Sequence, residues 1–198
     1  MKNSSSGLSI GEMRKVLKPE FFKRSTVKVA HELLGKFLVR KLGKKVSALM
    51  ITEVEAYDGF RDRGSHAFRG QTARTKIMFG SPGHWYVYFT YGMYYMLNIV
   101  TREEGYPAAI LIRSVRSVKN GEPRPKIRRE IKGPGRLTKF LRIDKKLNGA
   151  PASPKSGLWI EDRGFKVKKL KIKKGPRVGI AYAGQYWAGR HLRFWLSL

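Results

Sequence analysis

The stretch Ile51–Tyr57, ITEVEAY, decides how the rest of the chain is interpreted. From Val46 to Tyr57, side chains of different character alternate along the sequence. This alternation predicts a strand with two different faces. On one face the side chains change from apolar to acidic and then to aromatic, through Glu53, Glu55 and Tyr57. This change indicates that the strand leaves the protein core and ends at a pocket.

A carboxylate pair on an apolar strand is unusual in a chain with 42 Lys and Arg residues, only 14 Asp and Glu residues and a net charge of +28. If Glu53 and Glu55 both ionise on one face, the pKa of the inner one should be raised, which suits a general base near neutral pH. The pattern does not say which of the two is the inner one. The alternative is a carboxylate held by arginine or backbone donors for structural reasons.

The charge balance favours a polyanionic partner, and the basic surface predicts nucleic acid rather than a membrane. A lysine-rich surface kept for solubility is the alternative. The chain has no cysteine, which excludes disulfides and thiolate metal sites. No apolar run approaches the roughly 18 residues that span a bilayer, and Met1–Gly7 does not resemble a signal peptide. We therefore expect an intracellular protein, in the cytoplasm and nucleoid of a prokaryote or the nucleus of a eukaryote.

The 198 residues predict one compact domain over 12–198, preceded by a disordered tail over 1–11. Helical and strand patterns are mixed without a βαβ rhythm, which indicates an α+β fold with a mainly antiparallel curved sheet, flanking helices and a protruding β-hairpin. His31 is expected on the outer face of the first helix. Strands are predicted at 37–42, 46–57, 85–90, 94–100, 108–115, 158–160, 167–172, 177–182 and 191–198, and helices at 27–34 and around 137–141.

The long polar segment Asp58–Thr75 is predicted to be a functional loop, in which Asp58 and Asp62 pair with arginines. The hairpin that follows is rich in aromatic residues. Trp85, Phe89 and Tyr95 are expected in the core, as in an ordinary sheet face. Tyr91 at the hairpin tip is harder to explain in that way, because an aromatic tip can enter a base stack.

Taken together and in order, these stretches resemble the alkyladenine (3-methyladenine) DNA glycosylase family over roughly Phe21 to Leu196. The stretches that carry the resemblance are EVEAY (53–57), His66, RGQTAR (69–74), MF (78–79), PG (82–83), YVY (86–88), YGMY (91–94), LNI (97–99), AILIR (109–113), GPG (133–135) and RVGI (177–180).

The resemblance implies a monofunctional enzyme of base excision repair, active as a monomer on double-stranded DNA and without metal or other cofactor. Such an enzyme flips a damaged purine (alkylated adenine or guanine, hypoxanthine or ethenoadenine) out of the duplex. It then hydrolyses the N-glycosidic bond and leaves an abasic site. By this resemblance Glu55 is the general base that activates water, and Arg113, with the His66 region, helps to hold that water. Tyr57, His66 and Tyr88 form the walls around the flipped base. Asn98 disfavours guanine, and Tyr91 is the intercalating wedge. Contacts to the DNA backbone are expected from Arg74, Gly133, Gly135 and Arg136.

One position departs from the family pattern, because Ala181 stands where an acidic residue is often found. Two other hypotheses remain. A non-catalytic RNA- or DNA-binding protein fits the charge equally well but leaves Glu55, Tyr91 and Asn98 unexplained. A helix-hairpin-helix glycosylase built on Gly133–Gly135 is disfavoured, because residues 128–132 are charged rather than apolar.

Overall fold

The computed structural model describes residues 14–118, 127–165, 167 and 171–197, so the tail expected at 1–11 lies outside the described residues. Its helices and strands, in chain order, are β1 (Lys15–Val16), α1 (Pro19–Phe22), α2 (Thr26–Leu33), β2 (Phe37–Leu42), β3 (Lys45–Asp58), β4 (Trp85–Thr90), β5 (Tyr94–Val100), β6 (Ala108–Val118), β7 (Ile127–Lys132), α3 (Pro134–Phe140), β8 (Leu158–Asp162), β9 (Ile172–Gly175), α4 (Gly184–Gly189) and β10 (Arg193–Leu196).

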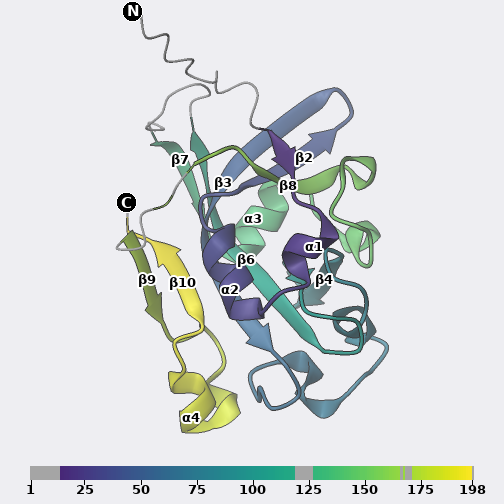
Figure 1. The fold of residues 1–198 in the computed structure, drawn as a ribbon, viewed down its shortest axis with the longest axis vertical. Helices are drawn as coiled ribbons and strands as arrows, with labels where there is room; N and C mark the ends of the chain where they lie inside the picture. Colours follow the sequence, from purple (N-terminus) through teal and green to yellow (C-terminus); the bar gives the residue numbers. More distant parts are fainter. Residues whose placement is uncertain (1–13, 119–126, 166, 168–170, 198) are drawn as a thin grey trace, which may run out of the picture.

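The ten strands form one sheet in which every described pairing is antiparallel. The main path is β1-β8-β2-β3-β6-β5-β4; β10 also pairs with β3, β9 with β10, and β7 with β6. β3 pairs with three strands and so lies at the centre of the sheet. Helices α1 and α2 lie in front of the sheet and α3 behind it, while β9, β10 and α4 form a limb at the lower left (Figure 1). The α+β fold with a mainly antiparallel sheet is therefore confirmed.

The two faces of β3 meet different surroundings, because cross-strand neighbours share a face. Val54 pairs with Ile112, and both lie in the main core together with Leu33 of α2. Glu55 pairs with Leu111 on the opposite face, where Leu111 lines a cavity. The long strand predicted from Val46 thus carries acidic residues away from the core at its far end, as expected.

The aromatic hairpin forms between β4 and β5, and its tip has an uncommon backbone. Tyr91 has φ +51° and Gly92 has φ +64°, and a positive φ is unfavourable for a bulky residue. Trp85 is fully buried as predicted, and Tyr95 packs partly buried against the core. The prediction for Phe89 was wrong, because its side chain is 50 % exposed and lies against the ring of Tyr95 at 4.9 Å.

The segment 177–182 is not the strand that its sequence predicts. Gly179 has φ +76°, which breaks an extended run, and a 3₁₀ turn over Ala181–Ala183 leads directly into α4. The strand predicted at 167–172 lies partly outside the described residues, and β9 begins at Ile172. Strand β7 was not predicted, because its basic residues hid its pairing with β6.

Two polar residues also differ from expectation. His31 is half-buried rather than solvent-facing, with its ring 4.2 Å from that of Phe194. Among the described residues no arginine pairs with Asp58; its carboxylate accepts a hydrogen bond from the Thr26 hydroxyl at 2.7 Å.

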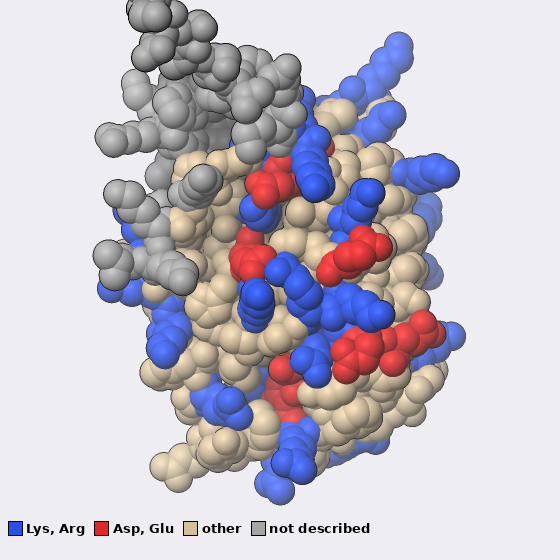
Figure 2. Space-filling view, viewed as in Figure 1, with Lys and Arg blue, Asp and Glu red and all other residues tan. Residues whose placement is uncertain are grey.

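Charged side chains are unevenly distributed over the surface. On the face that carries α1 and α2, acidic groups are interspersed among the basic ones (Figure 2). The part at the lower left, where Figure 1 places α4, shows basic and uncharged side chains instead. In the described part of the chain, no helix is both long and apolar enough to cross a membrane.

Candidate active site

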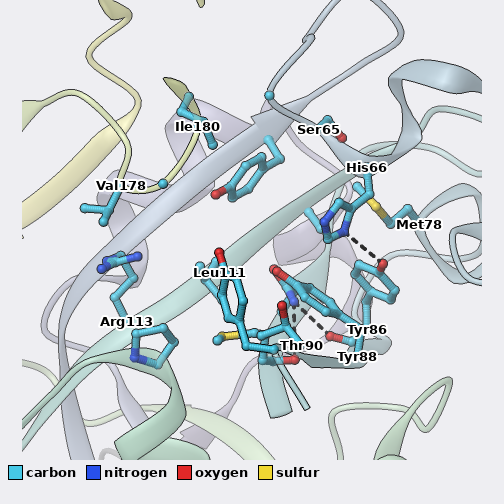
Figure 3. A pocket seen from close by; sticks show the side chains of 18 of the residues that line it. Ser65, His66, Met78, Tyr86, Tyr88, Thr90, Leu111, Arg113, Val178 and Ile180 are labelled. Carbon is cyan, nitrogen blue, oxygen red and sulfur yellow. Dashed lines mark hydrogen bonds between the residues drawn. The ribbon is translucent and has the colours of Figure 1, made fainter. Parts of the chain in front are cut away.

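A cavity of about 280 Å³ opens between the hairpin and the segment that precedes α4 (Figure 3). Its walls come from β3, the following loop, β4, β5, β6 and the start of α3. The residues that line it are Tyr57, Gly64, Ser65, His66, Met78, Tyr86, Tyr88, Thr90, Tyr91, Met96, Asn98, Ala109, Leu111, Arg113, Pro134, Val178, Gly179, Ile180 and Tyr182. Six of the residues predicted for the site are therefore brought together by strands and loops far apart in sequence.

Glu55 lies beneath the floor of this cavity and is bound to three residues that line it. Its side chain is fully buried. One carboxylate oxygen accepts the backbone N–H of Val178 at 2.8 Å and faces the Arg113 guanidinium at 3.3 Å. The other accepts the Tyr57 hydroxyl at 3.0 Å. Burial raises the pKa of Glu55 despite Arg113 and these two donors, which act in the opposite direction. Glu55 is thus the inner member of the acidic pair.

Glu53 is the outer member and is held in place by other charges. Its carboxylate accepts hydrogen bonds from Arg113 Nε at 3.1 Å and the Ser114 hydroxyl at 2.8 Å. Arg193 also approaches it at 3.4 Å. Arg113 therefore bridges the two carboxylates, and Glu53 orients the guanidinium that faces Glu55.

A buried ion pair fixes the wall beside Glu55. Arg177 donates to both carboxylate oxygens of Asp62, at 2.5 and 2.7 Å, and both side chains are fully buried. The same guanidinium donates to the Ala56 carbonyl and lies over the Tyr57 ring at 4.6 Å. Asp62 thus pairs with an arginine as predicted, but with one from the far end of the chain.

Aromatic rings and a histidine form the opposite wall. The rings of His66 and Tyr88 meet edge to face at 4.7 Å, and His66 Nδ1 lies 3.3 Å from the Tyr86 hydroxyl. Burial lowers the pKa of His66 to about 4, so the imidazole is neutral at physiological pH. Burial also raises the pKa of Tyr88. This wall presents flat, uncharged surfaces that suit a planar base.

Asn98 lies at one side of the cavity and Tyr91 at its mouth. The Asn98 side-chain amide donates to the carbonyls of Tyr86 and Met96, which fixes its orientation. Tyr91 is 80 % exposed at the hairpin tip. Such exposure, together with its positive φ, is unusual for a purely structural tyrosine.

The four residues predicted to contact the DNA backbone lie around the cavity rather than in it. The Arg74 guanidinium sits over the Tyr88 ring at 4.8 Å. Gly133 has φ +97° before α3, and a side chain on Gly135 would collide with the Tyr94 ring at 2.7 Å. Arg136 is exposed. Their contact with the DNA backbone stays a prediction.

Sequence reasoning missed the wall formed by Val178, Ile180 and Tyr182, because this segment was interpreted as a strand. The RVGI stretch marked the segment but not its position over Glu55. As for metals, no group of three or more His, Asp or Glu residues suited to hold an ion occurs in the described parts of the chain.

Comparison with known proteins identifies the family of the chain. The family model described as methylpurine-DNA glycosylase matches residues 20–198. The chain belongs to the methylpurine-DNA glycosylase family. As a member, it is a DNA glycosylase, a hydrolase of DNA repair that acts on alkylated purines.

Its relatives span most of the chain. A protein of Methanocella arvoryzae named "Putative 3-methyladenine DNA glycosylase" is 47 % identical over 177 residues, which cover 86 % of this chain and 87 % of the relative. Proteins of the same name from Legionella pneumophila (strain Paris) and Streptomyces avermitilis are 44 % and 42 % identical. The Legionella match covers 93 % of this chain and 96 % of the relative, and the Streptomyces match 93 % and 89 %.

Proposed function

We propose that the enzyme hydrolyses the N-glycosidic bond of a damaged purine with water activated by Glu55 and leaves an abasic site. The observation that carries this proposal is the burial of Glu55 against the cavity wall. It is fully buried, its pKa is raised by that burial, and it binds three residues of the cavity wall. A raised pKa makes a carboxylate a better base near neutral pH.

The chemistry requires such a group. A nucleobase leaves readily once alkylation or protonation gives it positive charge, and the sugar then develops positive charge in the transition state. A carboxylate beside that sugar stabilises the charge and takes a proton from the attacking water. Arg113, held by Glu53, helps to position the water. No step requires a metal or another cofactor.

The cavity would receive the base after it has turned out of the helix. The faces of Tyr57, His66 and Tyr88 would stack around it, and aromatic faces attract a cationic purine. Asn98 would crowd the 2-amino group of guanine and so favour other purines. The substrates we expect are alkylated adenine or guanine, hypoxanthine and ethenoadenine, whose weakened pairing lowers the energy of flipping.

DNA binding would use the hairpin and the surrounding basic groups. Tyr91 would occupy the space of the flipped nucleotide as a wedge. Arg74, Arg136 and the backbone N–H groups of Gly133 and Gly135 would bind phosphates. We expect a monomer, because the residues proposed for catalysis come from one chain, and an intracellular enzyme, because its substrate is DNA.

The test is base release from duplex oligonucleotides that carry one hypoxanthine, ethenoadenine, 3-methyladenine or 7-methylguanine, in EDTA. Glu55→Gln should lower the single-turnover rate by about 10²- to 10⁴-fold and leave duplex binding intact. Glu161→Gln is the matched control, because Glu161 is also a buried carboxylate paired with an arginine, Arg163. Retained turnover in Glu55→Gln would overturn the assignment. Binding without release from any lesion would favour a non-catalytic binder.

A further inference from the structure

Three aromatic residues and one arginine lie just before, within and just after α4, and most of them are exposed. We call Tyr182, Tyr186, Trp187 and Arg190 the α4 surface. The Tyr186 and Trp187 rings meet edge to face at 5.3 Å, and the Arg190 guanidinium lies 5.7 and 5.3 Å from them. Arg190 also donates to the Tyr186 hydroxyl at 3.3 Å. The contacts hold the side chains in a fixed arrangement, although Tyr182 and Tyr186 are each 69 % exposed.

The α4 surface is continuous with the cavity. Tyr182 lines the cavity mouth, and its hydroxyl donates to the Gly64 carbonyl at 3.1 Å. Ala183 is buried and anchors the chain between them. Tyr186 follows Tyr182 by four residues and lies in α4, which is part of the limb in Figure 1.

The charge around the α4 surface fits a polyanion. Asp162 is the last acidic residue of the sequence, whereas lysines and arginines recur beyond it. A similar arginine–tyrosine contact elsewhere in the described chain lies beside an acidic residue. Arg102 lies over Tyr106 at 4.5 Å, but it is ion-paired with Glu103. The part of the surface where Figure 1 places α4 shows basic and uncharged side chains instead.

Exposed aromatic faces stack on bases, and an arginine fork binds phosphate. An intact duplex encloses its bases, so stacking needs a base that is already partly unstacked. Withdrawal of one nucleotide into the cavity would loosen the adjacent step of the same strand. We infer that the α4 surface binds the nucleotide that flanks the flipped one, with Tyr186 stacking on its base and Arg190 on its phosphate. This inference rests on the proposed binding of a flipped nucleotide in the cavity.

Binding of three labelled duplexes tests it: undamaged, with one hypoxanthine, and with one hypoxanthine beside a mismatched pair. Tyr186→Ser should weaken binding of the two lesion duplexes by about 5- to 100-fold, most for the mismatched flank, with little change on undamaged DNA. Arg190→Ala should weaken all three and reduce the salt dependence of binding. Arg102→Ala is the matched control and should change none of them.

A second readout does not depend on a change in affinity. Lesion DNA should quench the tryptophan fluorescence of the wild type, and Trp187→Phe should reduce that quenching, because the Trp187 ring lies against that of Tyr186. If Tyr186→Ser binds every duplex as tightly as Arg102→Ala does, or if Trp187→Phe leaves the quenching unchanged, the inference is overturned. Failure of the Glu55 assignment has a different signature, because it appears as base release by Glu55→Gln and leaves these binding constants untouched.

Discussion

Two buried carboxylates near the end of β3, Asp62 and Glu55, contrast in how their charge is balanced. Both side chains are fully buried, and both bind the segment Arg177–Val178. Asp62 receives two N–H groups of one guanidinium and two backbone N–H groups, from Asp58 and Gly64.

Glu55 has weaker compensation. Its arginine, Arg113, is 3.3 Å away and is shared with Glu53. Its other donors are one backbone N–H and one tyrosine hydroxyl. Burial therefore dominates and raises the pKa of Glu55. We infer that the fully paired Asp62 serves the fold, whereas the incomplete pairing of Glu55 supports its proposed role in the chemistry.

Removal of the charge on Asp62 should give the largest loss of stability. Asp62→Asn leaves the buried Arg177 guanidinium without its counter-ion, which should lower the free energy of unfolding by about 3–5 kcal/mol. Urea unfolding measures this as a lower midpoint with an unchanged slope. Asp58→Asn is the control. Asp58 is half-buried and its described side-chain hydrogen bond comes from a neutral hydroxyl, that of Thr26, so its substitution should lower stability much less. If Asp62→Asn lowers the free energy of unfolding by less than about 1 kcal/mol, the structural role of the Asp62–Arg177 pair is contradicted.

The pH dependence of base release should show the ionisation of Glu55. The base must be ionised, so the rate should fall about tenfold per pH unit below the raised pKa of Glu55. 7-Methylguanine DNA suits this measurement best, because its base is already charged and does not need protonation. The acid limb should lie above the ordinary pKa of glutamate, while His66 titrates separately at about 4. An acid limb governed only by a group of pKa about 4 would argue against Glu55.

The sequence predicted features that depend on neighbouring residues. The alternation from Val46 to Tyr57 identified β3 and its acidic end, and the hairpin was evident from two β-rich arms around Gly92. The order of short motifs brought Glu55, His66 and Asn98 into one hypothesis.

Features that depend on distant partners were not predicted. Residues 177–182 alternate like a strand, but Arg177 is buried by an aspartate 115 positions away, and the chain turns at Gly179. The exposure of Phe89 depends on the hairpin projecting beyond the core. For the same reason, only the folded chain distinguishes Glu55 from Glu53 as the inner carboxylate.

Neutralisation of Glu55 should affect stability with the opposite sign to Asp62→Asn. The pKa of Glu55 is raised on folding, so the folded state holds this proton more tightly, and stability falls as pH rises through the window between its unfolded and folded pKa. Glu55→Gln removes that penalty. At pH 7 it should raise the free energy of unfolding by about 0.5–2 kcal/mol, seen as a melting temperature that exceeds the wild type. At a pH below the window the two proteins should melt together, and a lower melting temperature for Glu55→Gln at pH 7 would contradict the argument.

The smallest expected effect comes from the hydroxyl that joins Tyr57 to Glu55. Tyr57→Phe keeps the ring beneath the Arg177 guanidinium but removes a hydrogen bond that lowers the pKa of Glu55. The acid limb of 7-methylguanine release should therefore move to higher pH. Well above that limb the rate should stay within about tenfold of the wild type, because one hydrogen bond contributes about 0.5–1.5 kcal/mol. If Tyr57 acted only as a wall for the base, the limb would stay in place and only binding of the lesion would weaken. Tyr88→Phe is the control, because no hydrogen bond joins the Tyr88 hydroxyl to Glu55 among the described contacts, and its acid limb should stay close to that of the wild type.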